Sequence, residues 1–188
     1  STPPAWSPDG RQIAYLQGGP PKLIYYAVPK LAIVPAAGGP PRLVAASLDR
    51  TLGRLRWSPD GASIYCLFEE DGSVHLAKIQ AASGKVERLL TGQRTLGDFA
   101  MGPGGKIAVL NSSAQQPFEV FALEGTNLRP LSRQNDAFLA QVRLGTTEQV
   151  SVKSKDGTAV TAFIVKPPDY QAGRKYPTIL RIHGGPVG

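Results

Sequence analysis

The chain reads Trp-Ser-Pro-Asp-Gly at residues 57–61 and again at residues 6–10. A degenerate copy, Met-Gly-Pro-Gly-Gly, occupies residues 101–105. Pro59 follows Pro8 by 51 residues, and Pro103 follows Pro59 by 44 residues. Repeats of about 40 to 50 residues are typical of β-propeller blades. This stretch therefore predicts a stack of at least three blades.

Each Ser-Pro-Asp-Gly segment has the chemistry of a hairpin turn. Proline fixes φ near the value that the turn needs, aspartate closes the turn with its side chain, and glycine accepts positive φ. The strand after the turn is apolar at successive positions, as in residues 13–16 and 64–67. A strand covered on both faces is what stacked blades require. We therefore expect Trp6 and Trp57 to pack between blades, and Cys66 to pack in the core.

A second hairpin follows each repeat, so the sequence predicts four strands per unit. A longer connection over residues 17–28 explains the longer first period and is expected to project as a loop. The second hairpins pair these ranges: 30–34 with 42–44, 74–79 with 86–90, and 118–123 with 128–131.

The blade pattern stops between residues 134 and 147. A strand with period-2 alternation follows at residues 148–154, and Asp156-Gly157 is a strong hairpin signal. The return strand covers residues 158–165 and ends at Lys-Pro-Pro. We therefore predict a domain boundary at residues 140–147.

The last stretch, residues 175–186, reads Lys-Tyr-Pro-Thr-Ile-Leu-Arg-Ile-His-Gly-Gly-Pro. Its apolar, β-branched part, residues 178–182, predicts a buried strand of a parallel sheet. The glycine pair after it leaves backbone N–H groups open to a close approach, and such donors can stabilise a developing oxyanion. A tight turn after an edge strand is the alternative interpretation.

Composition narrows the class of protein. Of 188 residues, 41% are hydrophobic, and 21 glycines with 17 prolines indicate a turn-rich β protein with a real core. No apolar run approaches the roughly 20 residues of a membrane-spanning helix. The net charge is +7, but the basic residues are scattered singly, which favours a solvated surface over nucleic-acid binding. Both ends are expected to lie inside a longer protein, so the compartment, cytoplasmic or periplasmic, stays open.

The ordered combination of these motifs resembles the prolyl oligopeptidase family of serine peptidases, and most closely its acylaminoacyl-peptidase-like branch, which has His-Gly-Gly-Pro. The resemblance implies a mainly β chain. Residues 1–140 would form the last three or so blades of a TolB/WD40-like β-propeller, and residues 148–188 the first strands of an α/β-hydrolase domain.

The resemblance also implies an activity. The intact protein would hydrolyse short peptides by acyl transfer, as acylaminoacyl- or dipeptidyl-peptidases do, with the propeller limiting access. Gly185 would offer its N–H to the oxyanion, His183 would stand where other branches have a tyrosine, and Gly184 would shape the loop. The partners would be small peptide substrates, with no cofactor, metal, nucleic acid or membrane.

The catalytic triad is expected downstream of this chain, because no Gly-x-Ser-x-Gly occurs in it. The 188 residues alone are therefore predicted to be inactive. His75 lies in a predicted blade strand, where a core or rim role is favoured over a catalytic base.

Two other functions remain open. A TolB-like propeller that binds proteins explains residues 1–137 equally well, and an esterase would use the same oxyanion loop. The acidic cluster at residues 69–71 could bind a peptide amine, although a hairpin tip is where solvated charge normally lies.

Overall fold

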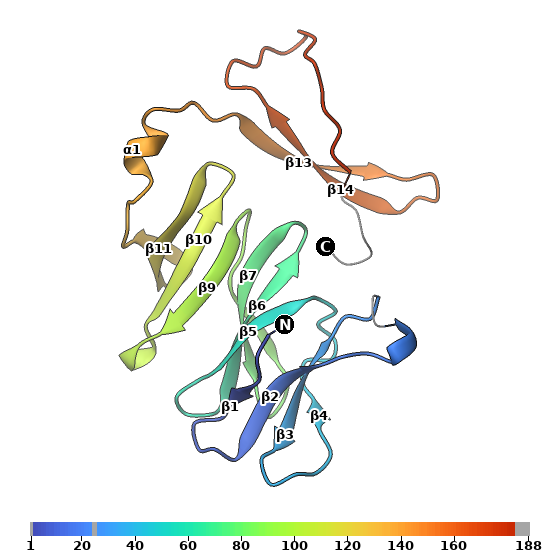
Figure 1. Cartoon of the computed structure of the whole chain (residues 1–188), viewed down its shortest axis with the longest axis vertical. Helices are drawn as coiled ribbons and strands as arrows, with labels where there is room; N and C mark the ends of the chain where they lie inside the picture. Colours follow the sequence, from blue (N-terminus) through green and yellow to red (C-terminus); the bar gives the residue numbers. More distant parts are fainter. Residues whose placement is uncertain (1, 24–25, 183–188) are drawn as a thin grey trace.

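The computed structural model describes residues 2–23 and 26–182, and its strands form three four-stranded antiparallel units followed by a separate hairpin (Figure 1). Within each unit the strands pair in chain order, which confirms the predicted blades. One parallel bridge between Val74 and Thr95 joins the second unit to the third. The bounds in the first unit are β1 Ala5–Trp6, β2 Gln12–Gln17, β3 Lys30–Pro35 and β4 Arg42–Leu43.

The second and third units have longer strands than the first. The second consists of β5 Leu52–Trp57, β6 Ser63–Glu70, β7 Ser73–Gln80 and β8 Val86–Leu90. The third consists of β9 Thr95–Met101, β10 Ile107–Ser113, β11 Gln116–Glu124 and β12 Asn127–Pro130. Short 3-10 turns lie at η1 Pro21–Leu23, in the predicted loop, and at η2 Pro103–Gly105, in the degenerate repeat.

The Ser-Pro-Asp-Gly turns close through their side chains. The Ser58 hydroxyl donates to Asp60 Oδ1 at 2.5 Å, and the same oxygen accepts the Ala62 N–H at 2.9 Å. Gly61 has φ +70° and donates its N–H to the Ser58 carbonyl at 2.9 Å. The first turn repeats this pattern with Ser7 and Asp9. Local hydrogen bonding thus explains how these residues turn the chain from the first strand to the second in the first two blades.

β6 shows how the blades stack. Side chains alternate across a strand, so successive residues of β6 face opposite neighbours. Ile64, Cys66 and Phe68 are buried in a cluster shared with the first blade. Leu67 is buried in a second cluster shared with the third blade. Burial raises the pKa of the Cys66 thiol to about 12, so this cysteine is a core residue, as predicted.

The two tryptophans of the repeat have different environments. Trp57 is 7% exposed and donates from Nε1 to the Ala5 carbonyl of the first blade at 2.9 Å, which confirms inter-blade packing. Trp6 is 61% exposed, so the same prediction is wrong for it among the described residues. The reason is positional, because Trp6 stands on the face of the first blade that no described segment covers.

The hairpin after the blades also agrees with the sequence. The helical turn α1 Asp136–Leu139 comes first, and β13 Thr146–Lys153 then pairs with β14 Ala159–Lys166. The predicted strand at residues 178–182 is wrong, since no described residue from 167 to 182 is in a strand. Ile179 is 94% exposed. A core strand of a parallel sheet needs hydrogen-bonding neighbours on both sides, and the described chain offers this stretch none.

No helix in the described part of the chain is long and apolar enough to cross a membrane.

Candidate functional site

The candidate site includes the turn between β6 and β7. Its central residues, Asp71 and Gly72, have φ values of +50° and +73°, as a two-residue type I′ hairpin requires. The turn places Glu70 opposite Ser73 at the tip of the second blade. The acidic stretch of residues 69–71 therefore does lie at a hairpin tip, as predicted.

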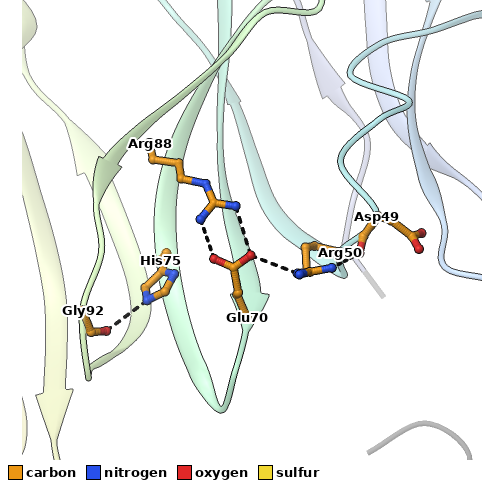
Figure 2. Close-up of polar contacts among 6 residues, drawn as sticks. All are labelled: Asp49, Arg50, Glu70, His75, Arg88 and Gly92. Atoms are coloured by element: carbon orange, nitrogen blue, oxygen red, sulfur yellow. Dashed lines mark hydrogen bonds and ion pairs between the residues drawn. The ribbon is translucent and has the colours of Figure 1, made fainter. Parts of the chain in front are cut away.

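Glu70 is not a solvated charge, however. Its side chain is 15% exposed and lies between two arginines (Figure 2). Arg88 donates from both Nη atoms, with Nη2 at 3.0 Å from Oε1, and Arg50 donates from Nε at 3.1 Å. The hydrogen bonds from Arg88, together with the charges of both arginines, hold the pKa of Glu70 below its ordinary value. The prediction of a solvated charge is therefore confirmed for the exposed Glu69 and Asp71 but is wrong for Glu70.

His75 links this tip to the next loop (Figure 2). It is 7% exposed, its Nε2 lies 3.0 Å from the Gly92 carbonyl oxygen, and its ring meets the edge of Phe68 at 5.2 Å between centroids. Arg88 lies over the other ring of that pair, 5.1 Å from the centroid of Phe68. These contacts make His75 a core residue, as the sequence predicted, and give it no access to a reacting atom.

A cleft of about 570 Å³ separates the blade tips from the hairpin β13–β14. The turns β6–β7, β8–β9 and β10–β11 form one wall and the hairpin forms the other. Arg94 is the one charged residue among the described residues that line it. The cleft is lined by Gly72, Ser73, Gln93, Arg94, Thr95, Ser112, Ser113, Ala114, Gln115, Thr147, Gln149 and Phe163.

Two contacts hold the hairpin over the blade tips. Gln115 donates from Nε2 to the Gly145 carbonyl at 2.6 Å. Gly72 lies against the ring of Phe163 so closely that an added Cβ would stand 2.6 Å from Cζ. The glycine is therefore needed twice, for its positive φ and for this close approach.

The predicted oxyanion residues, His183, Gly184 and Gly185, lie outside the described residues. No group of three or more His, Cys, Asp or Glu side chains that could hold a metal occurs within the described ranges. The two arginines on Glu70 and the single arginine of the cleft escaped the sequence reading. Arg88 lies within the strand predicted at residues 86–90, and the sequence of that strand carries no signal for an ion pair.

Comparison with known proteins shows which proteins this chain resembles. No protein-family model matches the chain. Dipeptidyl-peptidase 5 of Porphyromonas gingivalis is 27% identical over 191 residues, covering 98% of this chain and 27% of that protein. An acylaminoacyl peptidase structure matches with a TM-score of 0.74 at 20% identity, over 90% of this chain and 25% of the other. TolB from Acinetobacter baumannii matches with a TM-score of 0.54 at 13% identity, over 86% and 40%.

The blades have the fold of peptidase propellers. The relatives that match this chain are peptidases of the prolyl oligopeptidase type, dipeptidyl-peptidase 5 and acylaminoacyl peptidase, which confirms the resemblance seen in the sequence. The chain spans about a quarter of the length of the dipeptidyl-peptidase 5 proteins that it resembles.

Proposed function

We propose that the protein containing this chain is a serine peptidase that hydrolyses short peptides by acyl transfer, and that its propeller limits access of the substrate. The observation that carries the proposal is the continuity of the match. The likeness to dipeptidyl-peptidase 5 covers 98% of the chain, so it runs through the blades and on through the hairpin.

The proposed division of labour follows the sequence. Residues 1–140 form part of the propeller, and residues 148–188 open the α/β-hydrolase domain. The polar cleft between blade tips and hairpin then lies where a substrate passes from one to the other. Its volume of about 570 Å³ is in the range of small-molecule sites.

The proposed oxyanion donors follow the hairpin in the chain. Gly185 gives its backbone N–H to the oxyanion, Gly184 shapes the loop, and His183 contributes a side-chain donor. Loss of one such donor typically lowers kcat by about 10²–10³. His183→Ala is the practical variant, because the glycine donors belong to the backbone.

The test is labelling and hydrolysis by the protein that contains this chain. A fluorophosphonate probe is expected to label it, and dipeptidyl- and acylaminoacyl-nitroanilides are expected to be cleaved until the probe blocks the reaction. The 188 residues alone, which contain no Gly-x-Ser-x-Gly, are expected to do neither. Activity of the isolated chain that serine reagents block would overturn this assignment.

Two alternatives remain. The first is a protein-binding propeller, which the likeness in fold to TolB leaves open and which predicts no labelling by the probe. An esterase would use the same acyl-transfer chemistry. It would be labelled but would cleave a p-nitrophenyl ester while leaving the matching amide intact.

A further inference from the structure

Among the described residues, Arg94 is the one charged side chain that lines the cleft between the blade tips and the hairpin. Other arginines of the described chain, such as Arg50, Arg56 and Arg88, pair with carboxylates. Arg94 has no ion pair with any residue between 2 and 23 or between 26 and 182. The cleft therefore carries a net positive charge that nothing in the described chain neutralises.

The guanidinium also makes no hydrogen bond to the part of the chain that the structure describes. Arg94 is half-buried, and its Nε is buried without an acceptor among the described residues. A buried donor left unsatisfied costs roughly 1–3 kcal/mol, and more when it is charged. Buried polar groups in folded proteins are nearly all hydrogen-bonded, so this donor calls for a partner from outside the described residues.

The arginine is held in place from two sides. Its backbone carbonyl accepts the Val74 N–H at 3.0 Å, and Thr95 beside it forms the bridge between the second and third blades. Its guanidinium lies on Gly92, where an added Cβ would stand 3.5 Å from Nη2 and 3.6 Å from Nε. The carbonyl of the same glycine contacts His75 Nε2 at 3.0 Å. A charge fixed in this way binds with less loss of side-chain entropy than a free one.

The surrounding groups suit an acidic ligand of peptide type. Hydroxyl and amide side chains share the wall, and Phe163 gives it one apolar surface. The planar guanidinium matches a carboxylate with two parallel N–H···O bonds. We propose that Arg94 binds a carboxylate of a short peptide in this cleft. The inference rests on the proposed peptidase function and adds a substrate class to it.

Two sources could supply that carboxylate, the C-terminus of the peptide or an acidic side chain. A set of three peptides separates them: a neutral peptide with a free C-terminus, its C-terminal amide, and the amide with one glutamate. The variants are Arg94→Ala and Arg94→Lys in the protein containing this chain. Arg133→Ala is the control, since Arg133 is exposed and this substitution removes the same charge outside the cleft.

We expect Arg94→Ala to raise KM for the carboxylate peptide by about 10–100-fold, as loss of a charge-assisted hydrogen bond implies. The change in kcat is expected to be smaller than about threefold, because the contact exists in ground state and transition state alike. Arg94→Lys restores part of the affinity, whereas the amide peptide and Arg133→Ala show no change. Equal effects on acid and amide, together with a lower melting temperature, would overturn the proposal and give Arg94 a structural role instead.

The wild-type protein alone also tests the inference, should the variants fail to fold. It is expected to have a KM at least tenfold lower for the best carboxylate peptide than for its neutral amide, and equal values overturn the proposal. Calorimetry with the same peptides made from D-residues measures binding apart from hydrolysis, and so separates the two proposals. Carboxylate-dependent binding of these peptides, with no hydrolysis of the L-peptides, would keep Arg94 as a carboxylate-binding residue and reject the peptidase. Hydrolysis without a carboxylate preference would do the reverse.

Discussion

Trp57 shows at the scale of one residue how the blades hold together. Its ring fills the space between two blades, and its Nε1 donates to the Ala5 carbonyl at 2.9 Å. Trp57→Phe removes the hydrogen bond and some volume, so we expect the free energy of unfolding to fall by about 1–2 kcal/mol. Trp57→Ala also leaves a cavity and is expected to cost about 3–5 kcal/mol.

The measurement for Trp57 is urea denaturation of the protein containing the chain. Tyr15→Phe is the control, because it removes only an exposed contact of 3.3 Å to Gln17. It is expected to change the free energy by less than about 0.5 kcal/mol. Equal effects of the two Phe substitutions would mean that Trp57 does not bridge the blades.

Glu70 makes a second prediction at the scale of a residue. Glu70→Gln keeps the shape of the side chain but leaves Arg50 and Arg88 side by side without a negative charge. We expect a loss of about 1–2 kcal/mol, since bonds between charged groups are worth more than neutral ones and solvent screens part of this cluster. Glu69→Gln is the matched control on the neighbouring exposed residue, with an expected change below about 0.5 kcal/mol.

Thermal unfolding at low and high salt would check the Glu70 cluster. The difference between Glu70→Gln and wild type is expected to shrink as salt rises, because salt screens partly exposed charges. An equal loss of stability from Glu69→Gln and from Glu70→Gln would mean that the contacts of Glu70 with Arg50 and Arg88 do not stabilise the fold.

At the scale of the element, one turn design recurs in the blades and in the hairpin. Asp156 repeats the role of Asp9 and Asp60: it accepts from the Ser154 hydroxyl and from the Thr158 N–H. Serine hydroxyls give the largest contribution to holding the pKa of all three carboxyls down, and that of Asp156 falls to about 2. A folded-state pKa below the unfolded one stabilises the fold above the unfolded pKa, and this stability is lost as pH falls through the folded value.

For Asp156 this predicts an acid limb between about pH 4 and about pH 2, and Asp9 and Asp60 are expected to add a loss of stability below the ordinary pKa of aspartate. Asp60→Asn keeps an oxygen acceptor but removes the titration. We expect a lower free energy of unfolding at neutral pH and a shallower fall on acidification than in wild type. Urea denaturation at a series of pH values measures both. Asp71→Asn is the control. An identical acid limb in wild type and Asp60→Asn would mean that Asp60 does not contribute to the loss of stability at low pH.

Sequence reading succeeded where structure is local. A Ser-Pro-Asp-Gly turn forms through hydrogen bonds within five residues, so strands and hairpins could be placed before any neighbour was known. It failed where burial depends on distant segments. Trp6 and Trp57 share one local sequence yet differ in exposure from 61% to 7%.

Long-range pairing explains the missed parts of the candidate site. The ion pairs of Glu70 need Arg50 and Arg88, which lie 20 and 18 residues away in the chain. Arg94 lies in a polar loop, and its sequence neighbours give no sign of a binding role. That role is suggested only by the cleft that the hairpin forms with the blade tips. The apolar run of residues 178–182 has the composition of a core strand, but composition cannot supply the neighbouring strands.

At the scale of the whole molecule, Gly72 tests whether the hairpin rests on the blades. Gly72→Ala combines an unfavourable positive φ with a clash against Phe163, whereas Gly61→Ala has a similar φ of +70° with no contact nearer than 3.7 Å. Left-handed backbone costs an alanine about 1–2 kcal/mol at either site. We expect the extra loss at Gly72 to disappear when Phe163→Ala accompanies it, in a double-mutant cycle of urea denaturation. Additive effects would mean that the two parts do not touch in solution.

The stack of blades makes a last prediction about the 188 residues made on their own. Each blade contacts only its neighbours, so the end blades of an open stack leave one face uncovered. Trp6 is 61% exposed on the first blade, Phe118 is 45% exposed on the third, and Ile179 is 94% exposed after the hairpin. Because apolar surface of this kind associates in water, the isolated chain is expected to form oligomers or aggregates. Light scattering after size exclusion would detect them, and polar replacement of Trp6 and Ile179 together is expected to reduce them. A monomer that melts in one cooperative transition would show instead that three blades and a hairpin are a sufficient folding unit.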